Sequence, residues 1–166
     1  FLSQLQYIIG KENFDNTLKK YFDDWSFRHP KPNDFIRSAE KVSGLELDWY
    51  LLDWAQSTMT IDYSINSVYG VDSKTKIVLK RIGQMGMPVD VRIVLDSGDS
   101  LDFNIPMTKM RGSKPVENST LLESWSWAKP YYEFWIDVDS NKISKILIDP
   151  KKEMADINRD NNSLDL

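Results

Sequence analysis

Cysteine is absent from this 166-residue sequence, and histidine occurs only once, as His29. Without cysteine the chain has no disulfide, no thiol nucleophile and no thiolate metal ligand. A single imidazole excludes a metal site built on two or three histidines. No Gly-x-Ser-x-Gly turn occurs, so a serine triad is not indicated either. Hydrolytic or metal chemistry within these residues would therefore depend on carboxylates.

Long apolar runs and an excess of positive charge are also missing. No apolar run approaches the ~20 residues of a membrane-spanning helix, so no membrane span is expected. Lys and Arg number 21 against 25 Asp and Glu, and the net charge of −4 predicts no nucleic-acid partner. A hydrophobic fraction of 41% is ordinary for a globular protein. The cysteine-free composition is compatible with a cytoplasmic, a secreted or a periplasmic location.

The first ten residues have the pattern of a helix that is already under way. Leu2, Leu5, Ile8 and Ile9 recur at helical spacing, and Gly10 suits the position after a helix end. Neither an initiator Met nor a signal-peptide pattern precedes them. We therefore expect the sequence to be a fragment of a longer protein.

Residues 11–57 have helical periodicity. One apolar stripe predicts a helix that ends near residue 25, and it consists of Phe14, Leu18, Tyr21, Phe22 and Trp25. Pro30 and Pro32 exclude helix between residues 28 and 32, and Asn33 is the expected N-cap of a second helix. A third helix is expected to begin at Leu47 or Asp48. Its largely apolar composition predicts that it is well buried against something outside this chain.

From residue 60 the hydrophobic period changes from helical to two. Six strands are expected, near residues 61–68, 76–82, 89–95, 100–105, 131–138 and 143–148. Short strands without intervening helices are typical of an antiparallel sandwich or barrel. The sequence thus predicts an α+β protein with a helical part at 1–59, a β-sandwich at 60–150 and a polar C-terminal tail at 151–166. No flexible linker separates the first two parts, so we expect them to pack together.

Several residues are candidates for a catalytic role by their chemical type. His29 is suited to general-base catalysis by its pKa, yet no partner groups accompany it, and a structural role in the loop is the better interpretation. Asp23, Asp24, Asp48 and Asp53 are carboxylates of the kind that acid–base catalysis uses, but they are better explained as a solvated face.

Two further patterns were considered as binding sites. An aromatic cluster is suited to stacking on sugars or bases, although core packing and cross-strand pairing explain it better; it comprises Trp125, Trp127, Tyr131, Tyr132, Phe134 and Trp135. Asp156, Asn158 and Asp160 alternate as in a calcium loop, but the glycine and the distal Glu of that motif are missing. Whether these three residues bind a cation stays open, and no catalytic or metal-binding residue is predicted.

The order of several motifs resembles the zinc-dependent aminopeptidases of the aminopeptidase N and leukotriene-hydrolase type. The resemblance rests on the segments 8–14, 25–35 and 43–49 in the helical half and on 61–63, 79–83, 87–89, 149–150 and 155–158 in the second half. In a bacterial branch of that family, a fibronectin-type sandwich follows a thermolysin-like catalytic domain. The likeness covers essentially the whole chain.

The resemblance implies that this chain is a non-catalytic portion of a gluzincin metallopeptidase. The His-Glu-x-x-His helix, the third zinc ligand and the catalytic tyrosine of the family lie upstream of the matched segment, and Tyr7 is not assigned that role. Zinc and a peptide substrate would belong to the parent hydrolase, and the upstream catalytic domain would be this chain's partner. We expect the isolated fragment to bind no catalytic zinc, to be inactive, and to self-associate through exposed helical surface.

A second hypothesis from the residues is a stand-alone β-sandwich binding or adhesion module with a helical docking segment. The sequence leaves open the preferred N-terminal residue of a substrate, the oligomeric state and any contact of the sandwich with substrate.

Overall fold

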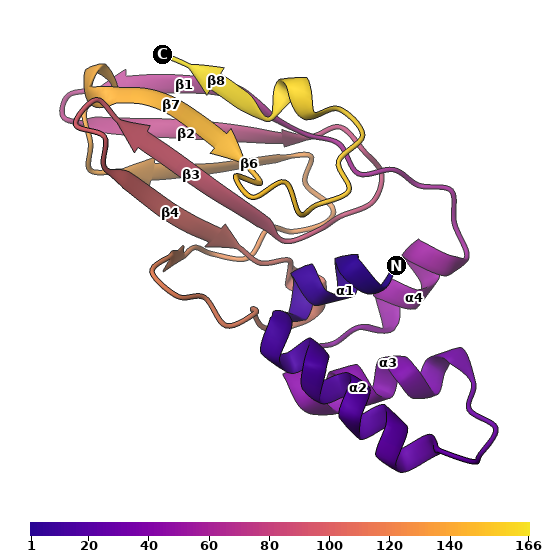
Figure 1. Ribbon diagram of the computed structural model, residues 1–166. Coiled ribbons are helices and arrows are strands. Elements are labelled where there is room, and N and C mark those ends of the chain that lie inside the picture. Colours follow the sequence, from indigo (N-terminus) through magenta and orange to yellow (C-terminus); the bar gives the residue numbers. More distant parts are fainter.

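The computed structural model describes residues 1–166 and places four helices beside two sheets (Figure 1). The helices are α1 (Leu2–Ile9), α2 (Lys11–Trp25), α3 (Pro32–Ser43) and α4 (Asp48–Ala55). Figure 1 shows α2 and α3 as a hairpin that points away from the sheets, with α1 and α4 between the hairpin and the sheets. None of these helices has the length and apolar character that crossing a membrane requires.

Eight strands form the second half of the protein. They are β1 (Tyr63–Val71), β2 (Lys74–Arg81), β3 (Val89–Leu95), β4 (Ser100–Ile105), β5 (Thr120–Leu121), β6 (Tyr131–Ile136), β7 (Ile143–Ile148) and β8 (Ser163–Asp165). One sheet has the order β1-β2-β6 and the other β5-β4-β3-β7-β8. Every pair is antiparallel except β4 with β5. The predicted α+β class with a sandwich-like arrangement is confirmed.

A single hydrophobic cluster connects the helices to the sheets. Its 31 buried residues include Leu5 and Ile8 of α1, Tyr50 of α4, and Ile77 and Ile93 from the two sheets. These five side chains are completely inaccessible to solvent. The expectation that the helical part and the sandwich pack together is therefore confirmed by a core that both parts share.

The start of α3 differs from the expected one. The helix begins at Pro32 and its N-cap is Lys31, not Asn33. Proline fits here because the first helical residue needs no N–H donor. The Asp34 carboxylate accepts a hydrogen bond of 2.7 Å from the Lys31 backbone N–H, which ties the helix start to the preceding loop. The helix ends as expected at Gly44, whose φ of 71° is left-handed.

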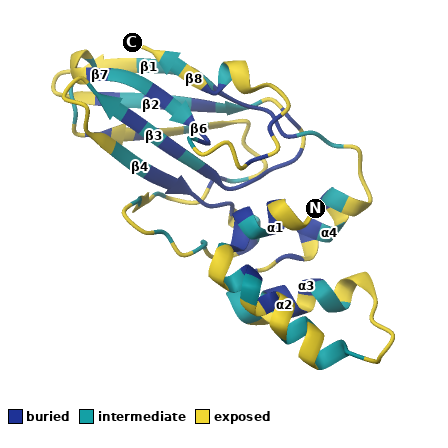
Figure 2. Ribbon diagram, viewed as in Figure 1, coloured by how far each residue is buried: buried dark blue, intermediate teal, exposed yellow.

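Helix α2 buries only part of its apolar stripe. Phe14 is 9% exposed and the Tyr21 ring packs edge-on against Phe35 at 5.1 Å. Leu18 and Phe22, by contrast, are 41% and 69% exposed. Figure 2 shows stretches of exposed residues along α2. α3 and α1 cover one side of α2, and nothing in the chain covers the side that carries Leu18 and Phe22.

Helix α4 is also buried on one side only. Tyr50 is fully buried, and its hydroxyl donates to the Phe1 carbonyl at 2.5 Å. Its ring lies 4.8 Å from that of Phe1. Leu52, on the other side, is 56% exposed. Within this chain only one face of α4 is buried, and burial of the other face against a part outside the chain stays a prediction.

The C-terminal segment, residues 151–166, is folded onto the sandwich. Met154 is completely buried, and the Ile157 N–H donates to the Ile61 carbonyl at 3.0 Å. Its last strand, β8, pairs with β7 at the edge of the five-stranded sheet. The segment therefore extends a sheet and helps to form the core in addition to being polar.

Candidate functional site

A large hollow lies where the helical part meets the sandwich. It is a groove of about 1160 Å³. Its walls come from α1 and α2 on one side and from β3, β4, the loop 114–119 and the turn after β7 on the other. Because both halves of the chain supply lining side chains, this groove is the first place to look for a site.

One wall of the groove holds a partly buried ion pair. The Lys114 ammonium lies 2.6 Å from the Asp90 carboxylate and 4.1 Å from the centre of the Tyr7 ring. The other carboxylate oxygen of Asp90 accepts a 2.7 Å hydrogen bond from the Asn104 amide. Lys114 is thus held by charge, by a cation–π contact and by burial together. The cluster fastens the loop 114–119 to α1 and to the sandwich.

Tyr7 is the point at which α1 reaches the sheet. Its hydroxyl donates to the Pro88 carbonyl at 3.0 Å. Burial, assisted by the negative charge of Asp90, holds the pKa of Tyr7 well above its usual value of 10.0. The phenol therefore stays protonated at neutral pH and acts as a hydrogen-bond donor that positions the helix.

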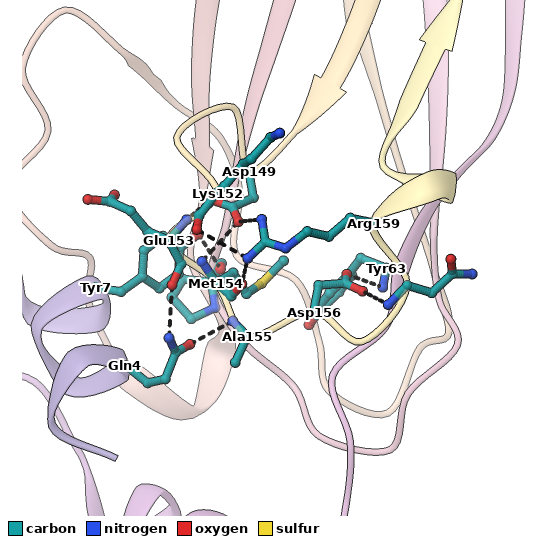
Figure 3. Close-up of polar contacts among 12 residues, drawn as sticks. Gln4, Tyr7, Tyr63, Asp149, Lys152, Glu153, Met154, Ala155, Asp156 and Arg159 are labelled. Atoms are coloured by element: carbon teal, nitrogen blue, oxygen red, sulfur yellow. Dashed lines mark hydrogen bonds and ion pairs between the residues drawn. The ribbon is translucent and has the colours of Figure 1, made fainter.

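Asp149, shown in Figure 3, organises the turn after β7, and its backbone N–H donates to the Asp90 carbonyl at 2.8 Å. Its carboxylate accepts hydrogen bonds of 2.9 Å from the backbone N–H groups of Glu153 and Met154, and Arg159 lies 3.4 Å away. Burial raises the pKa of Asp149 from its ordinary 3.8, although these three partners work against that shift. Asp149 itself has a left-handed φ of 49°. The turn begins at the Asp149 backbone, and the hydrogen bonds from Glu153 and Met154 to the Asp149 carboxylate hold its other end.

Gln4 connects this turn to α1 (Figure 3). Its side-chain amide donates to the Glu153 carbonyl at 2.8 Å and accepts from the Ala155 N–H at 3.0 Å. One side-chain amide thus pairs with a backbone carbonyl 149 residues away and with a backbone N–H 151 residues away in the sequence. Sequence reasoning missed Gln4 because a glutamine on a short helix carries no motif.

The polar groups of the groove are mostly paired with one another. Lys11 of α2 pairs with Asp15 at 2.7 Å, and Arg92 of β3 makes two hydrogen bonds of 2.7 and 2.8 Å to Asp102 of β4. The guanidinium of Arg92 lowers the pKa of the Asp102 carboxyl below its usual range. These two pairs each lie within one half of the chain, whereas Gln4, Tyr7 and Lys114 make the polar contacts that hold the two halves together.

The sequence-predicted candidates do not gather in the groove. His29 is exposed in the loop between α2 and α3, at the end of the hairpin far from the sheets (Figure 1). Asp23 and Asp48 are exposed, and Asp24 is paired with Lys20 at 2.9 Å. The hydrogen bond from Lys20 lowers the pKa of Asp24. Placing these three acids on a solvated face was correct.

Asp53 was expected on the same solvated face, and that expectation is wrong. Its residue is 6% exposed, and burial raises the pKa of its carboxyl. The Lys109 ammonium lies 3.9 Å away and favours the charged form. α4 turns Asp53 inward because the exposed side of this helix is the one that carries Leu52.

The six late aromatics divide into two groups. Trp125, Tyr132 and Phe134 belong to the core or pack against it, so the core interpretation is confirmed for them. It is wrong for the other three: Trp127, Tyr131 and Trp135 are 54%, 48% and 50% exposed. The period of two in β6 explains the division, because alternate side chains point to opposite faces of a sheet.

The calcium-like run serves as an anchor for the C-terminal segment. One carboxylate oxygen of Asp156 accepts from the Tyr63 N–H at 2.9 Å, and the other accepts from the Asn158 N–H at 2.8 Å (Figure 3). Both oxygens are therefore engaged within the protein. Asp160 is exposed in the short 3₁₀ turn Arg159–Asn161.

A second acidic cluster was not singled out by the sequence. Carboxylate oxygens of Glu40, Glu46 and Asp48 lie within 4.8 Å of one another between the end of α3 and the start of α4. Glu40 accepts a 2.8 Å hydrogen bond from the Leu47 N–H. Glu46 and Asp48 also line a hollow of about 350 Å³ together with the cation Lys109. By ligand type the cluster suits a hard cation, and no ion occupies it.

No protein-family model and no curated protein matches this chain.

Proposed function

We propose that this chain is the non-catalytic C-terminal portion of a zinc-dependent aminopeptidase of the aminopeptidase N and leukotriene-hydrolase type. The helices would close the thermolysin-like catalytic domain, and the strands would form the fibronectin-like sandwich that follows it. The proposal rests on the motif order in the sequence, above all on the segments 25–35 and 43–49. The whole enzyme would release N-terminal residues from peptides.

The observation that carries the proposal is the uncovered apolar surface of the helical part. Leu18 and Phe22 are exposed on α2, Leu52 is exposed on α4, and Leu2 of α1 is 49% exposed. Phe27, after α2, is fully exposed. Exposed apolar side chains gathered on one part of a protein indicate a contact surface. A preceding catalytic domain is the partner that the resemblance supplies for this surface.

The junction between the two parts is suited to a supporting role. Gln4 and Tyr7 fasten α1 to the sandwich, and the Glu46 N–H donates to the Met110 carbonyl at 3.0 Å. These contacts fasten α1 and the segment before α4 to the second half of the chain. In the whole enzyme, the sandwich would hold the helices in place while they line or support the active site.

The residues present do not fit a catalytic zinc ion. Zinc in this class of enzyme requires two imidazoles on one helix face, and His29 is an exposed loop residue followed by Pro30. The acidic cluster around Glu40 contains no imidazole. The zinc site and the catalytic residues would therefore belong to the upstream domain.

The test compares the natural protein with the 166-residue chain. We expect the natural protein to be larger, to contain stoichiometric zinc, and to hydrolyse an aminoacyl-coumarin reporter in a reaction that a chelator stops and zinc restores. The 166-residue chain should neither retain zinc nor turn over the reporter. Zinc with turnover in the short chain would refute the non-catalytic assignment. A natural protein that lacks both would refute the peptidase proposal and favour the stand-alone binding module.

A further inference from the structure

The outer face of the β1-β2-β6 sheet carries a row of aromatic and lysine side chains. The strand register places Tyr69 opposite Lys76 and Lys76 opposite Trp135. Residues that face each other across antiparallel strands project to the same side of the sheet. Further along the same face of β2 come Val78 and then Lys80. Lys80 lies opposite Tyr131 of β6. The row and the Tyr131 position thus belong to one surface.

This surface is the side of the sheet that faces away from the core. Tyr69, Tyr131 and Trp135 are 54%, 48% and 50% exposed. The alternate residues of β6, Phe134 and Ile136, are each 6% exposed and point into the sandwich. Three exposed aromatic rings on one face of a sheet mark a candidate contact surface. Within the chain, the Lys76 and Lys80 ammonium groups approach the Trp135 and Tyr131 rings at 5.9 and 5.7 Å.

Charges on the same face are arranged in pairs of opposite sign. Lys76 lies 2.7 Å from Glu133, and Lys74 lies 2.7 Å from Asp137. The Lys76 ammonium is also 5.9 Å from the centre of the Trp135 ring. The face therefore offers hydrogen-bond donors and acceptors beside each ring while carrying little net charge.

The spacing of the rings suggests a ligand. Tyr69 and Trp135 lie two strands apart, which corresponds to roughly 10 Å across a sheet. This is close to the length of a disaccharide unit in an extended glycan. We propose that the outer face of the β1-β2-β6 sheet binds a neutral oligosaccharide, with pyranose rings stacked on Tyr69 and Trp135. Lys76 and Glu133 would hydrogen-bond the hydroxyl groups between the stacked rings.

The chemistry of the face favours a glycan over other occupants. A pyranose has an apolar C–H face that fits an aromatic ring, and its hydroxyls both donate and accept, which matches the paired ammonium and carboxylate groups. Single-stranded nucleic acid favours a positively charged groove, whereas Glu133 and Asp137 offset the lysines here. A protein interface favours a core depleted of charge, and this face has ion pairs at its centre.

The inference goes beyond the proposed peptidase portion and does not depend on it. Its test titrates the natural protein with cellohexaose, laminarihexaose and xylohexaose, followed by tryptophan fluorescence and calorimetry. We expect saturable binding of at least one of the three. Trp135→Ala and Tyr69→Ala should each weaken that binding by about tenfold. Trp127→Ala, which removes an equally exposed tryptophan that lies beside Lys109, is the matched control and should leave the affinity unchanged.

Each alternative outcome has its own reading. Loss of binding with Trp135→Ala supports the proposal only if the variant keeps the far-UV spectrum and unfolding midpoint of the parent protein. Saturable binding of a single-stranded oligonucleotide in place of the hexasaccharides would overturn it. So would the absence of binding to all three sugars, or an equal loss with Trp127→Ala. Self-association abolished by Trp135→Ala, without sugar binding, would instead identify the face as a contact between copies.

Discussion

At the scale of single residues, Asp149 illustrates how a carboxylate can order a turn although burial disfavours its charged form. It accepts two backbone hydrogen bonds and faces Arg159, and its side chain is only 1% exposed. Burial nevertheless prevails, since the pKa of Asp149 is raised. The charged form is therefore less favourable in the folded protein than in the unfolded chain.

This shift predicts a pH dependence of stability. The folded-state pKa of Asp149 lies above its unfolded value of 3.8, so the folded protein binds this proton more tightly. The stability contributed by this proton is fully present below pH 3.8 and is lost as the pH rises through the raised pKa. Asp149→Asn replaces the titratable carboxyl group with an amide that does not titrate. The difference in unfolding free energy between wild type and variant should therefore widen as the pH falls.

Urea unfolding at about pH 4 and about pH 7 measures that difference. At neutral pH we expect Asp149→Asn to lower the free energy of unfolding by about 1–3 kcal/mol, because asparagine has one acceptor oxygen for two buried N–H groups. Asp72→Asn, at an exposed position in the β1–β2 turn, is the control and should have little effect. A wild-type-to-variant difference that stays constant or narrows on acidification contradicts the raised pKa.

Residue-scale properties were also the hardest to predict from the sequence. The inward turn of Asp53 depends on which side of α4 is covered, and the two hydrogen bonds of Gln4 depend on a segment 149 to 151 positions away. Neither fact has a local pattern. His29 lacked partner groups in the sequence, and in the structure it is an exposed loop residue.

At the scale of elements, the two edges of the apolar stripe of helix α2 have different environments. Phe14 and the fully buried Thr17 lie on the side that α1 and α3 cover. Leu18 and Phe22 lie on the open side. The free energy of folding of this chain should therefore depend on the first side, whereas its association with other molecules should depend on the second.

Two substitutions on α2 separate these roles. Phe14→Ala should lower the free energy of unfolding by about 3–5 kcal/mol, because it removes a buried ring and leaves a cavity. Phe22→Ser should change that free energy by about 0.5 kcal/mol or less, as is usual for an exposed position. Phe22→Ser should at the same time reduce self-association of the 166-residue chain, measured by sedimentation velocity. Unchanged association, or destabilisation as large as that of Phe14→Ala, would show that the Phe22 side is covered by the chain itself.

Elements were the level at which sequence patterns were most informative. A period of two located the six long strands, whereas the register shift between Ile65 and Ser67 of β1 is seen only in the structure. The short strands β5 and β8 were missed because two or three residues cannot show a period. The N-cap of α3 was misplaced because Pro32 was treated as excluding helix, whereas proline is favoured at the first helical position.

At the scale of the whole molecule, one hydrophobic core includes residues on both sides of the change in periodicity near residue 60. The helical part contributes Leu5, Ile8 and Tyr50 to the same cluster as the inner strands. Polar contacts from Gln4, Tyr7 and Lys114 cross the same boundary. Neither part can unfold without exposing apolar surface of the other.

The shared core predicts that the two parts unfold together. Calorimetry of the 166-residue chain should show one cooperative transition whose calorimetric and van't Hoff enthalpies agree. Gln4→Ala should shift this transition as a whole, because it leaves the Glu153 carbonyl and the Ala155 N–H without their partner at a cost of about 1–3 kcal/mol. At this chain length, each kcal/mol lowers Tm by about 2–4 °C.

Gln6→Ala is the control for this substitution, since Gln6 lies on the same helix and its side chain makes no hydrogen bond. It should leave the transition in place. Two resolved transitions in the wild-type protein would contradict a shared core and would make the junction a loose contact between independent domains. If Gln4→Ala shifted only a helical signal at 222 nm and left the near-ultraviolet signal of Trp125 unchanged, the same conclusion would follow. One transition that moves as a unit means that the sandwich holds α1, and through it the uncovered helical face, in a fixed orientation.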